Sequence, residues 1–245
     1  MSDEEVVLGI LPSRSVSSKE ASLSISDACK LVESGDLVLF SDRSWSASFI
    51  TVSCASRFSH LAIVYRPSGG RPLLLEAVLH PGKDIDVSFL IPESGVRLID
   101  FENHLQHFRG KAVAIRIVLT RKDLNASKPL KKHMTSVMEK VWEETKGKPY
   151  ETRAIDFLLS RFPFVEKRSE NLDRFFCSKL VALCYIRAGL LDTSVMPSSF
   201  LPDDFSATGD VTLKYPTVLP FPGLSAKFSE LIKFSDELYI NTSIL

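Results

Sequence analysis

The stretch at residues 173–191, DRFFCSKLVALCYIRAGLL, decides how the rest of the chain is interpreted. From Cys177 to Gly189, apolar residues recur every three or four positions, which predicts a helix with one buried face. Cys184 shares that face and is explained as a core residue. Cys177 lies in the first turn, where unpaired N–H groups and the helix dipole stabilise a thiolate. It is therefore either a buried thiol or a nucleophile, and a nucleophile needs a base.

The base must be a histidine that can accept the thiol proton. His60 opens the predicted strand HLAIVYR, so we expect it at the rim of a sheet, where it can face a helix end across a cleft. His104, His107 and His133 occur in polar contexts and are predicted to lie on the surface. A histidine in a strand is also commonly structural, and this alternative stays open.

Glu76 stands at the centre of the apolar run LLLEAVL, and an acid in a buried strand needs a partner. The intervening turn, PSGGR, predicts a hairpin that brings this strand beside the His60 strand. A carboxylate there would orient the ring and support the imidazolium, as in a catalytic triad. Two alternatives remain open. Glu76 pairs with a basic group such as Arg116, or His80, on the same strand face, takes the third position.

The hydrophobic pattern changes period along the chain. Short apolar runs between turn residues predict strands at 36–40, 60–66, 72–80, 86–91, 95–100 and 111–119. Periodic segments predict helices at 44–58, 100–108, 128–147, 151–162, 177–189 and 225–234. A further short helix is predicted with Ser26 or Asp27 as its N-cap and Gly35 as its stop. Strands in the first half and helices in the second predict an α+β fold, with an antiparallel sheet packed against helices.

Length and composition are those of one globular domain. The 245 residues are 44% hydrophobic and 24% charged, with 30 basic and 30 acidic side chains. The zero net charge argues against a nucleic-acid partner. Residues 121–148 nevertheless carry eight basic against four acidic groups, while residues 189–245 carry three against seven. Two solvated faces explain this asymmetry; the alternative is a peripheral contact between the basic segment and an anionic membrane.

The chain begins with acidic and Ser-rich residues rather than an apolar leader, and no apolar run approaches the length of a membrane span. We therefore expect a cytoplasmic protein with a flexible arm at 1–20 and a single domain at 21–245 that ends in a Pro-rich extension. The four cysteines, at positions 29, 54, 177 and 184, have neither disulfide nor metal-site spacing. They are expected to be free thiols.

Four segments together resemble a known superfamily: SGDLVLF, FSHLAIVYR, LLLEAV and FFCSKLVALCYIRAG. They are similar to the circularly permuted branch of the NlpC-type, papain-like cysteine hydrolases, in which the histidine strand precedes the cysteine helix. The YiiX/YaeF-like group is the nearest in pattern, with the lecithin retinol acyltransferase-like proteins as relatives. The resemblance covers residues 35–189 and implies a permuted papain-like fold.

The resemblance also implies roles for individual residues. Cys177 matches the nucleophile, His60 the general base and Glu76 the third, orienting residue. Ser178 follows the nucleophile, and its backbone N–H, with that of Cys177, would stabilise an oxyanion. Asp36 matches the turn that opens the family's first strand and is expected to cap that turn. GKPYE, at 147–151, resembles a G-x-P-Y-D stretch of the family, and PSSFLPDDF, at 197–205, a late segment.

The bulky pair Phe175 and Phe176 departs from the family pattern and suggests a narrow or lipid-compatible entrance. These features predict a cysteine-dependent hydrolase (peptidase or amidase) or an acyltransferase, acting on an amide or ester through an acyl-thioester. The expected partner is a small-molecule, lipid or peptide-like acyl substrate, and no metal or organic cofactor is implied. The alternatives are an inactive binding module that keeps the fold, and a helical interaction protein that docks through residues 128–146.

Overall fold

The structure, a computed structural model, describes residues 22–42, 56–79, 94–115, 117–119, 127–151, 171–206, 208, 209, 211, 213, 232–234 and 238–242. The predicted arm at 1–20 lies outside these residues. So do the predicted strand at 86–91, nearly all of the predicted helices at 44–58 and 151–162, and the side chains of His80 and Arg116.

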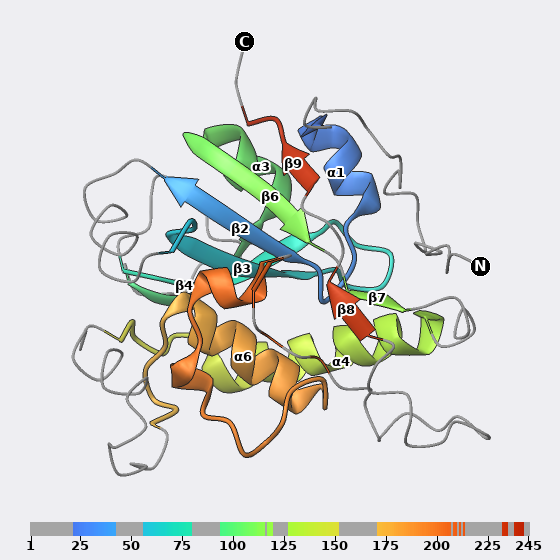
Figure 1. Ribbon diagram of the computed structural model, residues 1–245. Coiled ribbons are helices and arrows are strands. Elements are labelled where there is room, and N and C mark those ends of the chain that lie inside the picture. The colour runs from blue at the N-terminus through green and yellow to red at the C-terminus, as the bar shows by residue number, and fades with distance from the viewer. Residues whose placement is uncertain are drawn as a thin grey trace.

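The fold is α+β, as predicted, and a seven-stranded sheet forms its centre (Figure 1). The strands are β1 (Ser22–Leu23), β2 (Leu37–Asp42), β3 (His60–Tyr65), β4 (Leu73–Val78), β5 (Gly95–Asp100), β6 (Gly110–Ile115), β7 (Ile117–Leu119), β8 (Ile232–Phe234) and β9 (Leu238–Ile240). The large sheet has the order β1-β9-β6-β2-β3-β4-β5, and β7 pairs with β8 separately. Its neighbours are antiparallel, except that β1 and β9 are parallel.

The helices cover both faces of the sheet (Figure 1). They are α1 (Ile25–Leu31), α3 (Phe101–His107), α4 (Ser127–Thr145) and α6 (Cys177–Arg187), with 3-10 turns η2 (Pro197–Ser199) and η3 (Pro202–Phe205). Alternate strand residues divide between two apolar cores. Leu61 and Ile63 face the core formed with α4 and α6, whereas Ala62 and Val64 face the core formed with α1 and α3. No helix among the described residues is both long and apolar enough to span a bilayer.

The turn that opens β2 contains Gly35, although α1 ends at Leu31 with Val32 as its C-cap and not at Gly35 as predicted. Gly35 has a φ of +96°, and a Cβ at this position would lie 2.8 Å from the Cε atom of Met134 in α4, so glycine is required. The Asp36 carboxylate accepts the backbone N–H of Glu33 at 2.8 Å and caps the turn, as expected. Ser34 Oγ accepts the backbone N–H of Arg66 at 2.9 Å.

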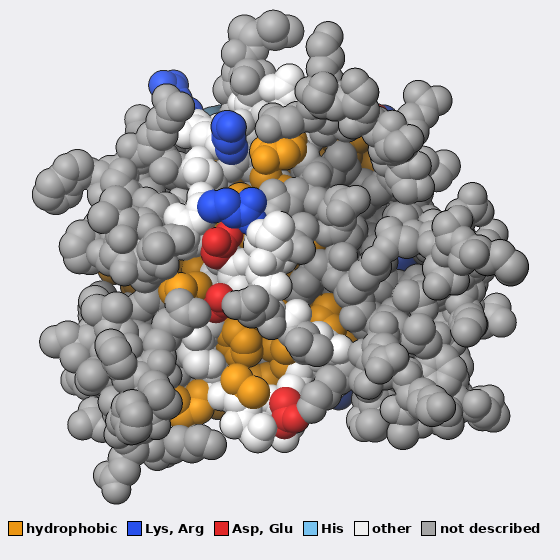
Figure 2. All heavy atoms as spheres, viewed as in Figure 1, with side chains coloured by type: hydrophobic (Ala, Val, Ile, Leu, Met, Phe, Trp, Pro, Cys, Tyr) orange, Lys and Arg blue, Asp and Glu red, His pale blue; other side chains and the backbone are white. Residues whose placement is uncertain are grey.

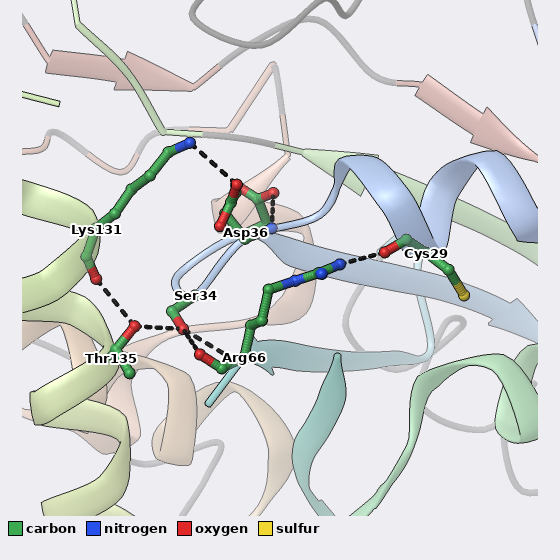
Figure 3. Close-up of polar contacts among 7 residues, drawn as sticks. Cys29, Ser34, Asp36, Arg66, Lys131 and Thr135 are labelled. Atoms are coloured by element: carbon green, nitrogen blue, oxygen red, sulfur yellow. Dashed lines mark hydrogen bonds and ion pairs between the residues drawn. The ribbon is translucent and has the colours of Figure 1, made fainter. Parts of the chain in front are cut away.

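The same turn connects the sheet to the helices of the α6 side. Thr135 of α4 donates its hydroxyl to Ser34 Oγ at 2.8 Å, so that α4, the turn and the end of β3 share one hydrogen-bond network (Figure 3). The hydroxyl of Tyr185, a fully buried residue of α6, donates to the Gly35 carbonyl at 2.9 Å. The position of α6 is therefore fixed against the start of β2.

Several predicted elements differ from the structure. α1 has Ser24, not Ser26 or Asp27, as its N-cap, because the Ser24 hydroxyl accepts the N–H of Asp27 and so satisfies the first turn. The predicted last helix at 225–234 is wrong at its end: residues 232–234 form β8, which pairs with β7. Next in the chain, β9 inserts between β1 and β6. Such pairing partners are distant in sequence, and a local pattern carries no signal of them.

Candidate active site

Cys177 is the first residue of α6, and only 6% of it is exposed. Phe176 is the N-cap, so no side-chain oxygen caps this helix. N-caps are usually Ser, Thr, Asp or Asn, whose side chains accept the N–H groups of the first turn. The start of a helix favours an anion, because the helix dipole and the N–H groups of the first turn point towards it.

The segment before Cys177 is held by the GKPYE stretch, residues 147–151. The Phe175 N–H donates to the Pro149 carbonyl at 3.1 Å, and the Glu151 N–H donates to the Phe175 carbonyl at 2.9 Å. On its other side the stretch binds β5, where the Val96 N–H donates to the Lys148 carbonyl at 2.9 Å. Residues 147–151 therefore tie the start of α6 to the edge strand of the sheet.

Close contact with β5 requires glycine at position 95. Gly95 has a φ of +145°, and a Cβ on it would lie 2.3 Å from the Lys148 carbonyl oxygen. No side chain fits in that space, and L residues rarely adopt that backbone conformation. The close contact between β5 and residues 147–151 therefore depends on glycine at position 95.

His60 and Glu76 meet across the predicted hairpin. The His60 Nε2 atom lies 2.5 Å from the Glu76 Oε2 atom; Glu76 is fully buried, and the His60 side chain is 22% exposed. The ladder between β3 and β4 ends at the pair Ile63 and Leu75, although β3 extends back to His60 and β4 continues past Glu76. The two side chains occupy this open end of the hairpin.

Arg97 of β5 is a third member of this cluster and was not predicted. It stands directly opposite Glu76 in the strand register. Its Nε atom donates to Glu76 Oε1 at 2.8 Å, and its Nη2 atom lies 2.7 Å from the same oxygen. The alternative partner considered from sequence, Arg116, lies outside the described residues. The available signal was the charge at the centre of the strand GVRLID, which needs a partner once that strand is buried.

The ionisation of the pair follows from these contacts. Burial by itself would lower the pKa of His60, but the Glu76 carboxylate, together with a side-chain hydrogen bond to Cys177, raises it to about 10. Burial would raise the pKa of Glu76, but the charges on His60, His104 and Arg97 and the hydrogen bond to His60 lower it well below the ordinary value. At neutral pH the pair is therefore imidazolium and carboxylate.

The hydrogen bond to Cys177 places the thiol beside the His60 ring. The Nε2 atom of the same ring contacts Glu76. The strand register alone does not predict this contact. Leu61 and Ile63 face α6, and side chains alternate along a strand, so His60 is expected on the opposite face of the sheet. His60 is the first residue of β3, at the open end of the hairpin, and from there its ring reaches the first turn of α6.

The remaining predicted residues are placed as follows. Ser178 is fully buried, and its hydroxyl donates to the Phe200 carbonyl at 2.6 Å, so the side chain itself is engaged away from an oxyanion. The prediction that His104 lies on the surface is wrong: it is 8% exposed, in edge contact with the Phe40 ring, because the residues of α3 at this position face the sheet. His107 is exposed, and His133 contacts the Ala188 carbonyl at 3.0 Å.

The chain was compared with known protein families, sequences and structures. No protein-family model and no curated protein sequence matches the chain. Among solved structures, the chain is similar to the crystal structure of the metalloprotein yiiX (DUF1105) from Escherichia coli O157:H7, with 22% sequence identity and a TM-score of 0.41. The alignment covers 64% of this chain and 66% of that one, so the chain spans slightly less than two thirds of the neighbour's length.

Proposed function

We propose that this chain is a cysteine-dependent hydrolase or acyltransferase with a permuted papain-like arrangement, in which Cys177 is the nucleophile, His60 the base and Glu76 the orienting residue. The observation that carries this proposal is the continuous contact from Glu76 through His60 to the thiol at the first turn of a helix. This is the order of groups that nucleophilic catalysis by a thiol requires.

The chemistry follows from the contacts. In the resting ion pair His60 already holds the proton that Cys177 gave up, and the thiolate attacks the carbonyl carbon of an amide or ester, forming a carbon–sulfur bond. The backbone N–H groups of Cys177 and Ser178 would donate to the oxyanion. Collapse expels the amine or alcohol, which takes the proton from His60 and leaves an acyl-thioester. Water or an acceptor, deprotonated by His60, then releases the acyl group and restores the thiol.

The word metalloprotein in the neighbour's name raises the question of a metal in this chain. Within the described residues, no three His, Cys, Asp or Glu side chains are grouped so that they could hold a metal ion. The Glu76 oxygens are already engaged by His60 and Arg97. The described site does not fit a metal ion, and no step of the proposed reaction uses one.

For the substrate, the surroundings favour a lipid acyl group over a polar peptide. Phe175 and Phe176, both buried, immediately precede the nucleophile. In Figure 2, hydrophobic side chains reach the surface over the region where Figure 1 places α6. Liposome co-sedimentation at low salt tests this preference; the protein is expected to pellet with anionic vesicles, and absence of binding would count against a membrane-associated substrate.

The primary test is the pH dependence of alkylation by iodoacetamide, read at each cysteine by peptide mass spectrometry. Cys177 is expected to react rapidly near pH 6, below the value of about 8.5 at which a free thiol ionises, and to lose this reactivity in His60→Ala. Cys29 is an internal control, because burial raises its pKa to about 11. The proposal is wrong if Cys177 reacts slowly, or if the His60 variant reacts equally fast.

A second assay asks for the acyl-enzyme. The protein is mixed with a series of p-nitrophenyl acyl esters, quenched in acid and weighed intact, with Cys177→Ser and Cys29→Ser as matched variants. We expect one added acyl group, absent only in the Cys177 variant. The alternative, a binding module that keeps the fold, is favoured by the low exposure of Cys177, 6%. If the enzyme takes up an acyl group from none of the esters, and alkylation does not depend on His60, that alternative is supported.

A further inference from the structure

We propose that Arg97 is a positioning residue whose positive charge balances the buried cluster of Glu76, His60 and Cys177 and so favours the thiolate over the thiol. This inference rests on the proposed function, because it assigns Arg97 a part in forming the nucleophile.

Arg97 binds the Glu76 carboxylate through two of its nitrogen atoms. Its Nε and Nη2 atoms both lie within 2.8 Å of Glu76 Oε1, whereas His60 binds the other oxygen, Oε2. Each carboxylate oxygen thus has its own cation. Arg97 is 5% exposed and Glu76 is fully buried, so neither charge is screened effectively by solvent. Any effect of Arg97 on Cys177 must pass through this carboxylate or through the field of its charge.

The signs alternate along the series of contacts. Arg97 is positive, Glu76 negative, His60 positive when it holds the thiol proton, and Cys177 then negative. The thiolate state is therefore electrically neutral as a cluster, and burial penalises an unbalanced charge more than a balanced set. Without Arg97 the same state would carry one net negative charge. The neutral alternative without Arg97 is a thiol beside an imidazolium and a carboxylate, which holds one more proton taken from solvent. Removal of Arg97 should therefore raise the pH at which the thiol gives up its proton.

Other ionisable groups near the cluster do not replace Arg97. Burial, with the charges of Cys177 and Glu151, raises the pKa of Tyr150, so that this residue is a neutral phenol at physiological pH. Among the described residues, His104 of α3 and Arg97 of β5 act on the Glu76 carboxylate, and Tyr150, in the segment before α6, interacts with Cys177 and Glu151. Arg97 is the cation among them that is charged at every pH of the assay.

The test compares Arg97→Gln, which removes the charge, with Arg97→Lys, which keeps the charge but loses the planar fork. The matched control is Arg187→Gln, which removes an exposed arginine of α6 whose partner is Glu144. Each purified full-length variant is alkylated with iodoacetamide between about pH 5 and pH 9, and the Cys177 rate is read by mass spectrometry, with folding checked by circular dichroism.

A unit charge separated from the thiol by Glu76 and His60, at an effective dielectric constant of about 20, is expected to move the ionisation of the thiol by about one pH unit. The Arg97→Gln profile should therefore shift upward by about one pH unit, so that labelling is about tenfold slower at a pH below both midpoints. Arg97→Lys should stay within about threefold of the wild type, and Arg187→Gln should be unchanged. An ion pair with a purely structural role would change stability and leave this profile in place.

Two results overturn the proposal: an unshifted profile in folded Arg97→Gln, or an Arg97→Lys profile shifted by a full pH unit. If Arg97→Gln does not fold, the Arg97→Lys variant alone tests the proposal, and a profile shifted by a full pH unit overturns it. If Cys177 is alkylated rapidly at low pH and Arg97→Gln shifts the profile, but no acyl-enzyme forms with any ester, only the proposed function is overturned. If Cys177 of the wild type is alkylated slowly, and His60→Ala is alkylated at the same rate, both proposals are overturned, because Cys177 is then not a thiolate.

Discussion

Replacement of Glu76 with Gln keeps the volume of a fully buried side chain and removes the negative charge that holds two cations. Removing one partner of a buried ion pair typically costs about 3–5 kcal/mol, because the remaining charge stays buried. The rise in the pKa of His60 from 6.5 to about 10 corresponds to about 5 kcal/mol, an upper bound for a ring that is 22% exposed. Both figures describe the same carboxylate and do not add, so we expect the free energy of unfolding to fall by about 3–5 kcal/mol at pH 7.

The pH dependence has a definite sign. The pKa of His60 is raised in the folded state, so its contribution to stability is complete below about pH 6.5 and is lost as the pH rises towards about 10. The wild type should lose about 1.4 kcal/mol per pH unit across that window. The pKa of Glu76 is lowered, so its contribution is present above its ordinary value of 4.5 and is lost as the pH falls further. The difference between wild type and Glu76→Gln is therefore largest between pH 4.5 and 6.5.

The assay is urea denaturation followed by far-UV circular dichroism at several pH values from about 5 to 10. Glu144→Gln is the matched control, because it removes the same charge from an exposed pair with Arg187, and it should cost less than about 1 kcal/mol. The reasoning is refuted if Glu76→Gln unfolds within about 1 kcal/mol of the wild type, or if its stability changes with pH in parallel with the wild type.

Three further substitutions test how the site is positioned. Gly95→Ala places a Cβ 2.3 Å from the Lys148 carbonyl and should lower the thermal midpoint by several degrees or abolish folding, whereas an unchanged melting curve would contradict the close contact. Ser178→Ala removes the hydrogen bond to the Phe200 carbonyl and should cost about 1–3 kcal/mol in urea denaturation while leaving the rate of acyl-enzyme formation within about threefold, because the oxyanion is assigned to backbone N–H groups. Asp36→Ala removes the cap of the turn before β2 and should cost about 1 kcal/mol in the same experiment; no loss would show that the cap is dispensable.

Much of the secondary structure could be predicted because it depends on local patterns. The helix at 128–147 has apolar residues on one face and is observed as α4. The helix from Cys177 is observed as α6. Its apolar pattern predicts one buried face, whereas every residue from Cys177 to Tyr185 is buried. Element ends such as the start of α1, and the strands β8 and β9, depend on partners elsewhere in the chain.

For the site, the sequence by itself determined which chemical groups are present and in which element each one lies. They are a cysteine in the first turn of a helix, a histidine at the start of a strand, and an acid in the middle of the next strand. These assignments need only residue type and local period. Their catalytic roles stay predictions.

Only the tertiary structure decided that these groups touch. In the structure the β3–β4 ladder ends before His60 and Glu76, and Arg97 lies opposite Glu76 in the register of β4 and β5. The glycine at 95 allows the GKPYE stretch to contact β5. The physical reason is that a local pattern specifies which face a side chain occupies but not which charge, many residues away, will be buried beside it. That choice depends on the register of the paired strands, and the energy of a buried charge depends on the partner that the register supplies.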